Sequence, residues 1–197
     1  MRALLIVASG VCLLLSACRI PVTEHPLSDE TNSRVDERLL GLWEVDLRPA
    51  HEINGSDGDE SAIYLIERDE QRENTLLVRM MREGEKSSHA LPAFTTHLGM
   101  HDYISFCNVG GKGSTAKAIC RYELTDADQG KLYLMSGEFV AQQIEQSAIK
   151  GTFDRASNGT LQGIAIKDSV EAQRDFILRK GEAVFLLEKP MECRRVK

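Results

Sequence analysis

The stretch LLGLWEV, Leu39 to Val45, opens the folded domain and is the first of a series of short β-like runs. Turn-forming residues separate the runs, as in Asn54-Gly55-Ser56-Asp57-Gly58-Asp59 and in Glu83-Gly84. The later runs are Ala62–Arg68, Leu76–Arg82, a run to about Leu98, Asp102–Val109, Ala116–Leu124, Leu132–Ser136 and Met191–Val196. Short runs with clear turns between them favour an antiparallel sheet or barrel.

Two helices interrupt this strand pattern, at about 138–149 and 169–180. In the first, apolar Val140 and Ile144 recur at helical spacing with polar residues between them. The second has a plausible N-cap in Ser169 and a C-cap in Gly181. The predicted fold is therefore α+β, mainly antiparallel β, with a strongly curved sheet or barrel in one domain, 39–197.

The motif Gly41-x-Trp43 resembles the Gly-x-Trp of lipocalins and related barrels. The resemblance implies that Trp43 packs across the closed end of a barrel. It also implies that an arginine of the last strand, Arg194 or Arg195, lies over the indole in a cation–π contact. The helix at 138–149 departs from the lipocalin order. The layout is also similar to uncharacterised bacterial envelope lipoproteins that begin Leu-Leu-Gly-x-Trp, a resemblance that implies no activity.

The N-terminus, residues 1–17, is predicted to be a secretory signal peptide. Arg2 supplies the positive start, and the uncharged run after it is shorter than the roughly 20 residues that span a bilayer. The run ends in Leu15-Ser16-Ala17-Cys18, which resembles a bacterial lipobox. This resemblance implies cleavage before Cys18 and acylation of its thiol. A plain secretory cut after Ala17 is the alternative.

A lipidated Cys18 implies a firm membrane anchor, because two or more acyl chains hold a protein stably. Arg19 follows it where an Asp would favour retention in the inner membrane, so the predicted location is the outer membrane, facing the periplasm. The polar residues after it predict a flexible tether over 18–38.

Net charge and cysteine spacing exclude some classes of binding partner and of cysteine chemistry. The chain has a net charge of −6, and removing a leader that contains Arg2 makes it −7, which argues against a nucleic-acid partner. Membrane association should come from the lipid. Cys107 and Cys120 point to opposite faces of their predicted strands, so buried free thiols are favoured over a disulfide between them. No CxxC spacing indicates zinc or a redox dithiol.

Motifs for catalysis or metal binding are weak in this sequence. Gly110–Thr115 lacks the spacing of a phosphate loop and leads into a strand-like run. His97 and His101 are four residues apart, but Gly99 between them indicates a turn rather than a zinc-binding helix. No Gly-x-Ser-x-Gly elbow is present. We predict no catalytic residue, metal ion or cofactor, and a protein that is not an enzyme.

The leading functional hypothesis is a barrel that holds a small apolar molecule, with Trp43, Phe106 and Tyr122 as ligand-binding residues. The candidate interior residues are Val78, Met80, Ile104, Phe106, Tyr122, Leu132 and Leu134. One alternative is an interior filled by its own side chains, which a small barrel permits. Another is an accessory or inhibitor lipoprotein that docks on an envelope protein.

Overall fold

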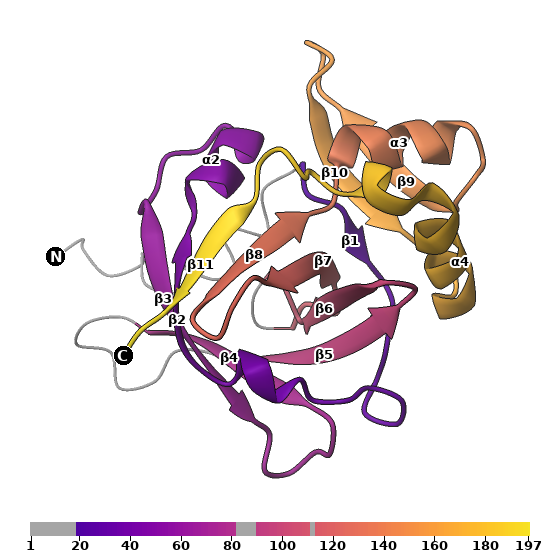
Figure 1. The fold of residues 1–197 in the computed structure, drawn as a ribbon. Coiled ribbons are helices and arrows are strands. Elements are labelled where there is room, and N and C mark those ends of the chain that lie inside the picture. The colour runs from indigo at the N-terminus through magenta and orange to yellow at the C-terminus, as the bar shows by residue number, and fades with distance from the viewer. Residues whose placement is uncertain (1–18, 82–89, 111–112) are drawn as a thin grey trace, which may run out of the picture.

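The structure is a computed structural model, which describes residues 19–81, 90–110 and 113–197. Its centre is a closed antiparallel barrel of eight strands, which confirms the predicted α+β barrel (Figure 1). The barrel strands are β2 (Gly41–Asp46), β3 (Ser61–Arg68), β4 (Leu76–Met81), β5 (Ala90–Leu98), β6 (His101–Cys107), β7 (Lys117–Leu124), β8 (Gln129–Leu134) and β11 (Met191–Arg195). Each strand up to β8 pairs with the next along the chain, and β11 pairs with both β8 and β2 to close the barrel.

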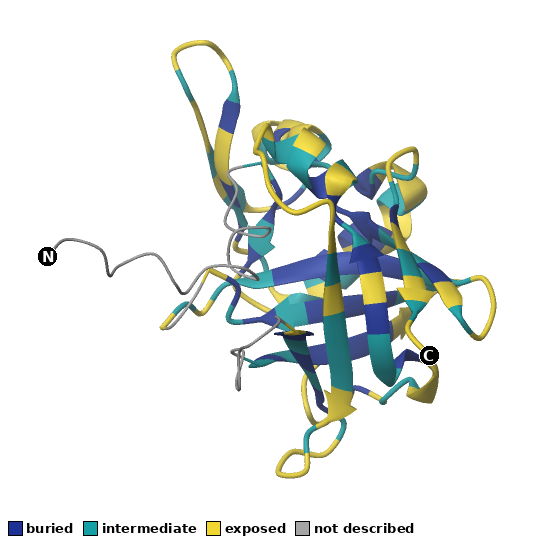
Figure 2. Cartoon of the chain, turned by 90° about the vertical axis from the view of Figure 1, so that its left-hand side faces the viewer, coloured by how far each residue is buried: buried dark blue, intermediate teal, exposed yellow. Residues whose placement is uncertain are grey.

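Side-chain alternation explains why these runs form a barrel. In β4, Leu76, Val78 and Met80 are buried, while Leu77 and Met81 lie on the outer face. Residues of one strand that are two apart share a face, so each strand contributes one row of side chains to the interior. Figure 2 shows that the exposed residues gather in the loops, while the strands carry most of the buried positions.

The chain between β8 and β11 forms a second layer on the outside of the barrel. It comprises α3 (Gly137–Glu145), the hairpin of β9 (Gly151–Arg155) and β10 (Leu161–Ile166), α4 (Val170–Lys180) and the 3-10 turn η2 (Gly181–Val184). Outward-facing Tyr103 and Ile119 of the barrel pack with Phe176 and Ile177 of α4 in one buried cluster. The domain therefore has two apolar cores, one inside the barrel wall and one outside it.

The predicted elements of this second layer agree with the structure. Helices predicted at 138–149 and 169–180 are found as α3 and α4. The Ser169 hydroxyl accepts a hydrogen bond from the Ala172 N–H, which is the predicted cap. Between the two helices, β9 and β10 form an antiparallel hairpin.

The segment 18–38 was predicted to be a flexible tether, and this is wrong for residues 19–38, which pack on the barrel. It contains β1 (Val22–Thr23), which joins β10 to β7, and the turn η1 (Glu37–Leu39). Leu27 is fully buried in the outer core, and its N–H donates to the Ser105 hydroxyl at 3.1 Å. The Ser33 hydroxyl donates to the Thr95 carbonyl at 2.9 Å. Tertiary contacts thus order a segment whose local sequence is polar.

Candidate functional site

The barrel encloses an apolar cavity of about 130 Å³. Its wall comes from all eight barrel strands and from two segments that cover the ends. An apolar cavity of roughly 150 Å³ in another protein stays dry and binds benzene. The barrel interior is therefore mostly filled by side chains, but it leaves room for a compact molecule of about that size.

All three predicted ligand-binding residues, Trp43, Phe106 and Tyr122, line this cavity. Five further residues were predicted to face the barrel interior. Four of them also line the cavity, namely Val78, Ile104, Leu132 and Leu134. Met80 is buried as predicted but is absent from the cavity wall. The period-two pattern thus identified the inner face of β4, β6, β7 and β8, the strands from which these positions come.

Trp43 closes the end of the barrel at which β2 begins. Its indole Nε1–H donates to the Leu39 carbonyl at 2.7 Å, and only 3% of the residue is exposed. The Arg195 guanidinium lies 4.4 Å from the centre of the ring, while Arg194 faces outward. The resemblance left two arginines open, and the structure selects Arg195.

Gly41 makes room for this closure. Its φ of +120° lies in the region that L side chains rarely adopt, and a Cβ there would lie 2.7 Å from Arg195 Nη1. Arg195 also donates through Nη1 to the Leu40 carbonyl and through Nη2 to the Arg38 carbonyl, the latter at 2.7 Å. The glycine and the tryptophan of the motif are thus linked through one arginine.

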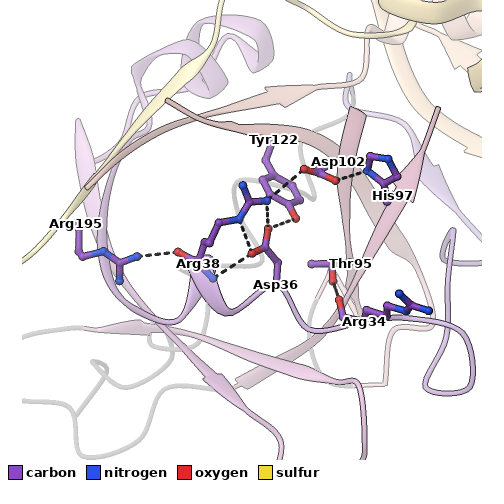
Figure 3. A network of polar contacts seen from close by, with 8 residues as sticks. All are labelled: Arg34, Asp36, Arg38, Thr95, His97, Asp102, Tyr122 and Arg195. Carbon is purple, nitrogen blue, oxygen red and sulfur yellow. Dashed lines mark hydrogen bonds and ion pairs between the residues drawn. The ribbon is translucent and has the colours of Figure 1, made fainter. Parts of the chain in front are cut away.

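A polar network continues across the same end (Figure 3). The Tyr122 hydroxyl points out of the cavity and donates to the Asp36 carboxylate at 2.9 Å. Arg38 binds both oxygens of that carboxylate, at 2.8 and 2.7 Å. Burial alone would raise the pKa of Asp36, but the hydrogen bonds from Arg38 and Tyr122 outweigh it and hold the pKa below its ordinary value. The Tyr122 hydroxyl, the one hydroxyl among the three predicted ligand-binding residues, is therefore engaged by Asp36 and does not offer a hydrogen bond to a ligand in the cavity.

The network ends in a hydrogen bond beside the β5–β6 turn. His97 Nδ1 lies 2.8 Å from Asp102, which also contacts Arg38. His101 is the first residue of β6 and pairs in register with Leu98, while His97 pairs in register with Asp102. The described ranges contain no group of three or more His, Cys, Asp or Glu side chains that could hold a metal ion. The predicted turn is confirmed, and the histidine pair stands outside the cavity.

The opposite end of the barrel is covered by residues that sequence reasoning missed. The helix α2 (Arg48–Asn54) follows β2 and brings Ala50 over the cavity, together with Leu47 before it. Ile20 covers the same end from the N-terminal segment and is only 4% exposed. Pro49 near the helix start and Gly55 as its C-cap were readable signals for α2. Nothing local marks Ile20.

Two cysteines contribute soft surface to the cavity wall. Cys120 and Cys193 both line it, and burial raises the pKa of each thiol to about 12. Cys107 lies on the opposite face of its strand, with a pKa that burial raises to about 11. All three are free thiols, which agrees with the prediction that Cys107 and Cys120 do not form a disulfide with each other.

Comparison with protein families, curated proteins and solved structures gives no match to this chain. Within the ranges that the structure describes, no helix is long and apolar enough to cross a membrane. The loop Gly110–Thr115, tested above as a phosphate loop, lies partly outside the described residues, at 111–112. A functional assignment therefore rests on the cavity and on the two ends of the barrel.

Proposed function

We propose that this chain is a lipid-anchored bacterial envelope lipoprotein whose barrel binds a small apolar molecule without chemical turnover. The cavity of about 130 Å³ is the observation that carries the binding proposal. Its wall combines aliphatic side chains with Trp43, Phe106 and Tyr122, and the Tyr122 hydroxyl is already engaged by Asp36. A ligand without polar groups suits such a wall, because a polar ligand would lose its hydrogen bonds to water there.

The size of the cavity narrows the ligand class. Room for a benzene-sized molecule fits a single unsubstituted aromatic ring or a short branched hydrocarbon. The surface of Cys120 and Cys193 is compatible with an aromatic edge, since sulfur makes favourable contacts with rings. A long acyl chain would require the end covered by Ile20 and α2 to open.

Benzene and toluene test the binding proposal directly. A saturating concentration of either probe should raise the melting temperature of the protein comprising residues 19–197. Native mass spectrometry of the same protein should show any ligand acquired during expression. Val78→Phe, which adds volume inside the cavity, should abolish the shift. Leu77→Phe is the matched control, because Leu77 lies on the outer face of the same strand. No shift with unmodified protein would indicate a void in a filled core instead.

The anchoring proposal rests on the lipobox and has a separate test. Replacing Cys18 by Ser in the full-length precursor should move the protein from the membrane fraction to the soluble periplasmic fraction. A soluble protein with unmodified Cys18 would instead favour the plain secretory cut after Ala17.

A second candidate function, docking on an envelope protein, is favoured by an apolar pair on the outer face. Ile63 of β3 and Met81 of β4 are cross-strand partners, and they are 39% and 45% exposed. A photo-crosslinker at Ile63 should then give one discrete crosslinked partner in whole cells. The same group at the exposed Glu67, further along β3, serves as the control. Crosslinks that are absent or equal at both positions would contradict this candidate.

A further inference from the structure

The N-terminal segment is fixed to one end of the barrel from its first described residue. Arg19 Nη1 donates to the Ile53 carbonyl of α2 at 3.2 Å. A Cβ on Gly137 would lie 2.1 Å from the Arg19 carbonyl oxygen, so the two backbones are in close contact where α3 begins. Ile20 is buried against the cavity, and Val22 already pairs with β10. The chain is therefore held against the domain from Arg19 onward.

The same segment begins one residue after the proposed lipidation site. A free tether over 18–38, as the sequence predicted, would give the domain a root-mean-square reach of about 25 Å and free rotation. Residues 19–38 do not form such a tether, because they pack on the domain. A lipid on Cys18 would therefore be joined directly to the end of the barrel that bears α2 and Ile20.

We infer that this α2 end of the barrel faces the lipid surface in the anchored protein, with the Trp43 end pointing away from the membrane. The inference rests on the proposed lipidation of Cys18. It follows from the fixed position of Arg19 and from covalent geometry, since adjacent Cα atoms lie 3.8 Å apart. The end of the cavity that Ile20 covers is then the one nearest to the acyl chains, where apolar molecules concentrate.

Surface charge does not supply this orientation. The loop between α2 and β3 lies at the same end and carries the exposed acidic residues Asp57, Asp59 and Glu60. Glu52 of α2 is paired with Lys189 at 2.6 Å. An acidic loop is repelled by anionic lipid. The orientation must therefore come from the short covalent connection, and lengthening that connection should abolish it.

Fluorescence quenching in vesicles tests the inference with the full mature lipoprotein. We would label Asp57→Cys at the α2 end and Ala127→Cys at the opposite end, both exposed positions in loops. The lipoproteins would be reconstituted into vesicles of phosphatidylethanolamine and phosphatidylglycerol that contain lipids with a quencher on the headgroup. Quenching should be several-fold stronger at position 57 than at position 127. A flexible Gly/Ser insertion between Cys18 and Arg19 should make the two positions equal while the protein remains in the membrane.

The outcomes separate the orientation from the anchor. Equal quenching at the two positions in the protein of native length, with release of Cys18→Ser from membranes, would overturn the orientation alone. Retention of Cys18→Ser in the membrane fraction would overturn the lipid anchor and the orientation with it. Unequal quenching that survives the Gly/Ser insertion would mean that the surface itself binds lipid, which also overturns the inference.

Discussion

The Arg195 guanidinium lies 4.4 Å from the centre of the Trp43 ring, and the same side chain donates hydrogen bonds to the carbonyls of Leu40 and Arg38. The last strand of the chain is thereby tied to the first strand of the barrel and to the turn before it. Arg195 Nε also donates to the Ala127 carbonyl of the β7–β8 turn at 3.0 Å, and the Arg195 backbone N–H donates to the Asp128 carbonyl at 2.8 Å. One residue thus links β11 to two other segments that are far apart in sequence.

Removing this side chain should destabilise the domain. We expect Arg195→Ala to lower the free energy of unfolding by about 1–3 kcal/mol, because it removes a cation–π contact and leaves carbonyls unpaired. Urea unfolding followed through the fluorescence of Trp43, the single tryptophan, measures it. Arg194→Ala is the control, since Arg194 is exposed on the same strand, and it should change stability by less than about 0.5 kcal/mol. Equal effects of the two variants would contradict the assigned role.

Gly41→Ala should be destabilising for a different reason. The backbone there has a positive φ, and the added Cβ would collide with Arg195 Nη1 at 2.7 Å. A strained residue of this kind costs about 1–3 kcal/mol. Gly163 in β10 is the matched control, because it has no positive φ and no neighbour within 4 Å of an added Cβ. Thermal unfolding should show a clear fall in melting temperature for Gly41→Ala alone.

The Asp36 network should make stability depend on acid pH. Hydrogen bonds from Arg38 and Tyr122 lower the pKa of Asp36 in the folded state. Its contribution to stability is therefore complete above the ordinary carboxyl pKa of about 3.9, and it is lost as the pH falls through the lower folded value. Asp36→Asn should be less stable than the unmodified protein at pH 7, with a difference that shrinks between about pH 4 and pH 2. A difference independent of pH would assign the effect to packing.

The cavity thiols should react slowly in the folded protein. Burial raises the pKa of Cys120 and Cys193 to about 12, so at pH 8 their thiolate fraction is about three orders of magnitude below that of a free cysteine. Iodoacetamide labelling followed by intact-mass spectrometry should show protection in buffer and rapid labelling in urea. Benzene should protect Cys193 further if it occupies the cavity. Labelling of Cys193 at the rate of a free thiol would contradict a closed barrel.

Ile20→Ala should enlarge the ligand site. The truncation leaves added space at the α2 end and lowers stability by about 2–4 kcal/mol. Leu27→Ala is the control, because Leu27 is equally buried but belongs to the outer core. Both variants should be destabilised, and only Ile20→Ala should acquire affinity for a probe larger than toluene, such as naphthalene. Calorimetric titration distinguishes them, and equal affinity in both would place the added space elsewhere.

The sequence predicted the barrel well because each strand carries its own information. Alternation in β4 and β6 identifies the inward residues, and the cap residues Ser169 and Gly181 mark α4 without reference to any other element. Phe106 and Tyr122 could be assigned to the cavity wall for the same reason, whereas Trp43 was assigned to it through the resemblance of Gly41-x-Trp43 to the lipocalin motif.

The ends of the barrel could not be predicted in the same way. Leu27 and Ser33 lie in a polar segment, and their burial depends on Ser105 and Thr95, which are distant in sequence. Ile20 covers the cavity through a tertiary contact that no local periodicity signals. The resemblance to a known motif narrowed the partner of Trp43 to two arginines. Only the register of β11 against β2, which pairs Arg195 with Trp43, decided between them.

The position of β11 after all the other barrel strands also constrains how the protein folds. Synthesis from the N-terminus makes Met191–Arg195 after the strands that it joins, so β2 and β8 keep unpaired edges until β11 has been made. Open strand edges invite pairing with other chains. The whole outer layer, from α3 to η2, is synthesised during this interval and already covers part of the wall. A truncation that removes Met191 to Lys197 would therefore leave β2 and β8 without their shared partner, in an open sheet prone to aggregation.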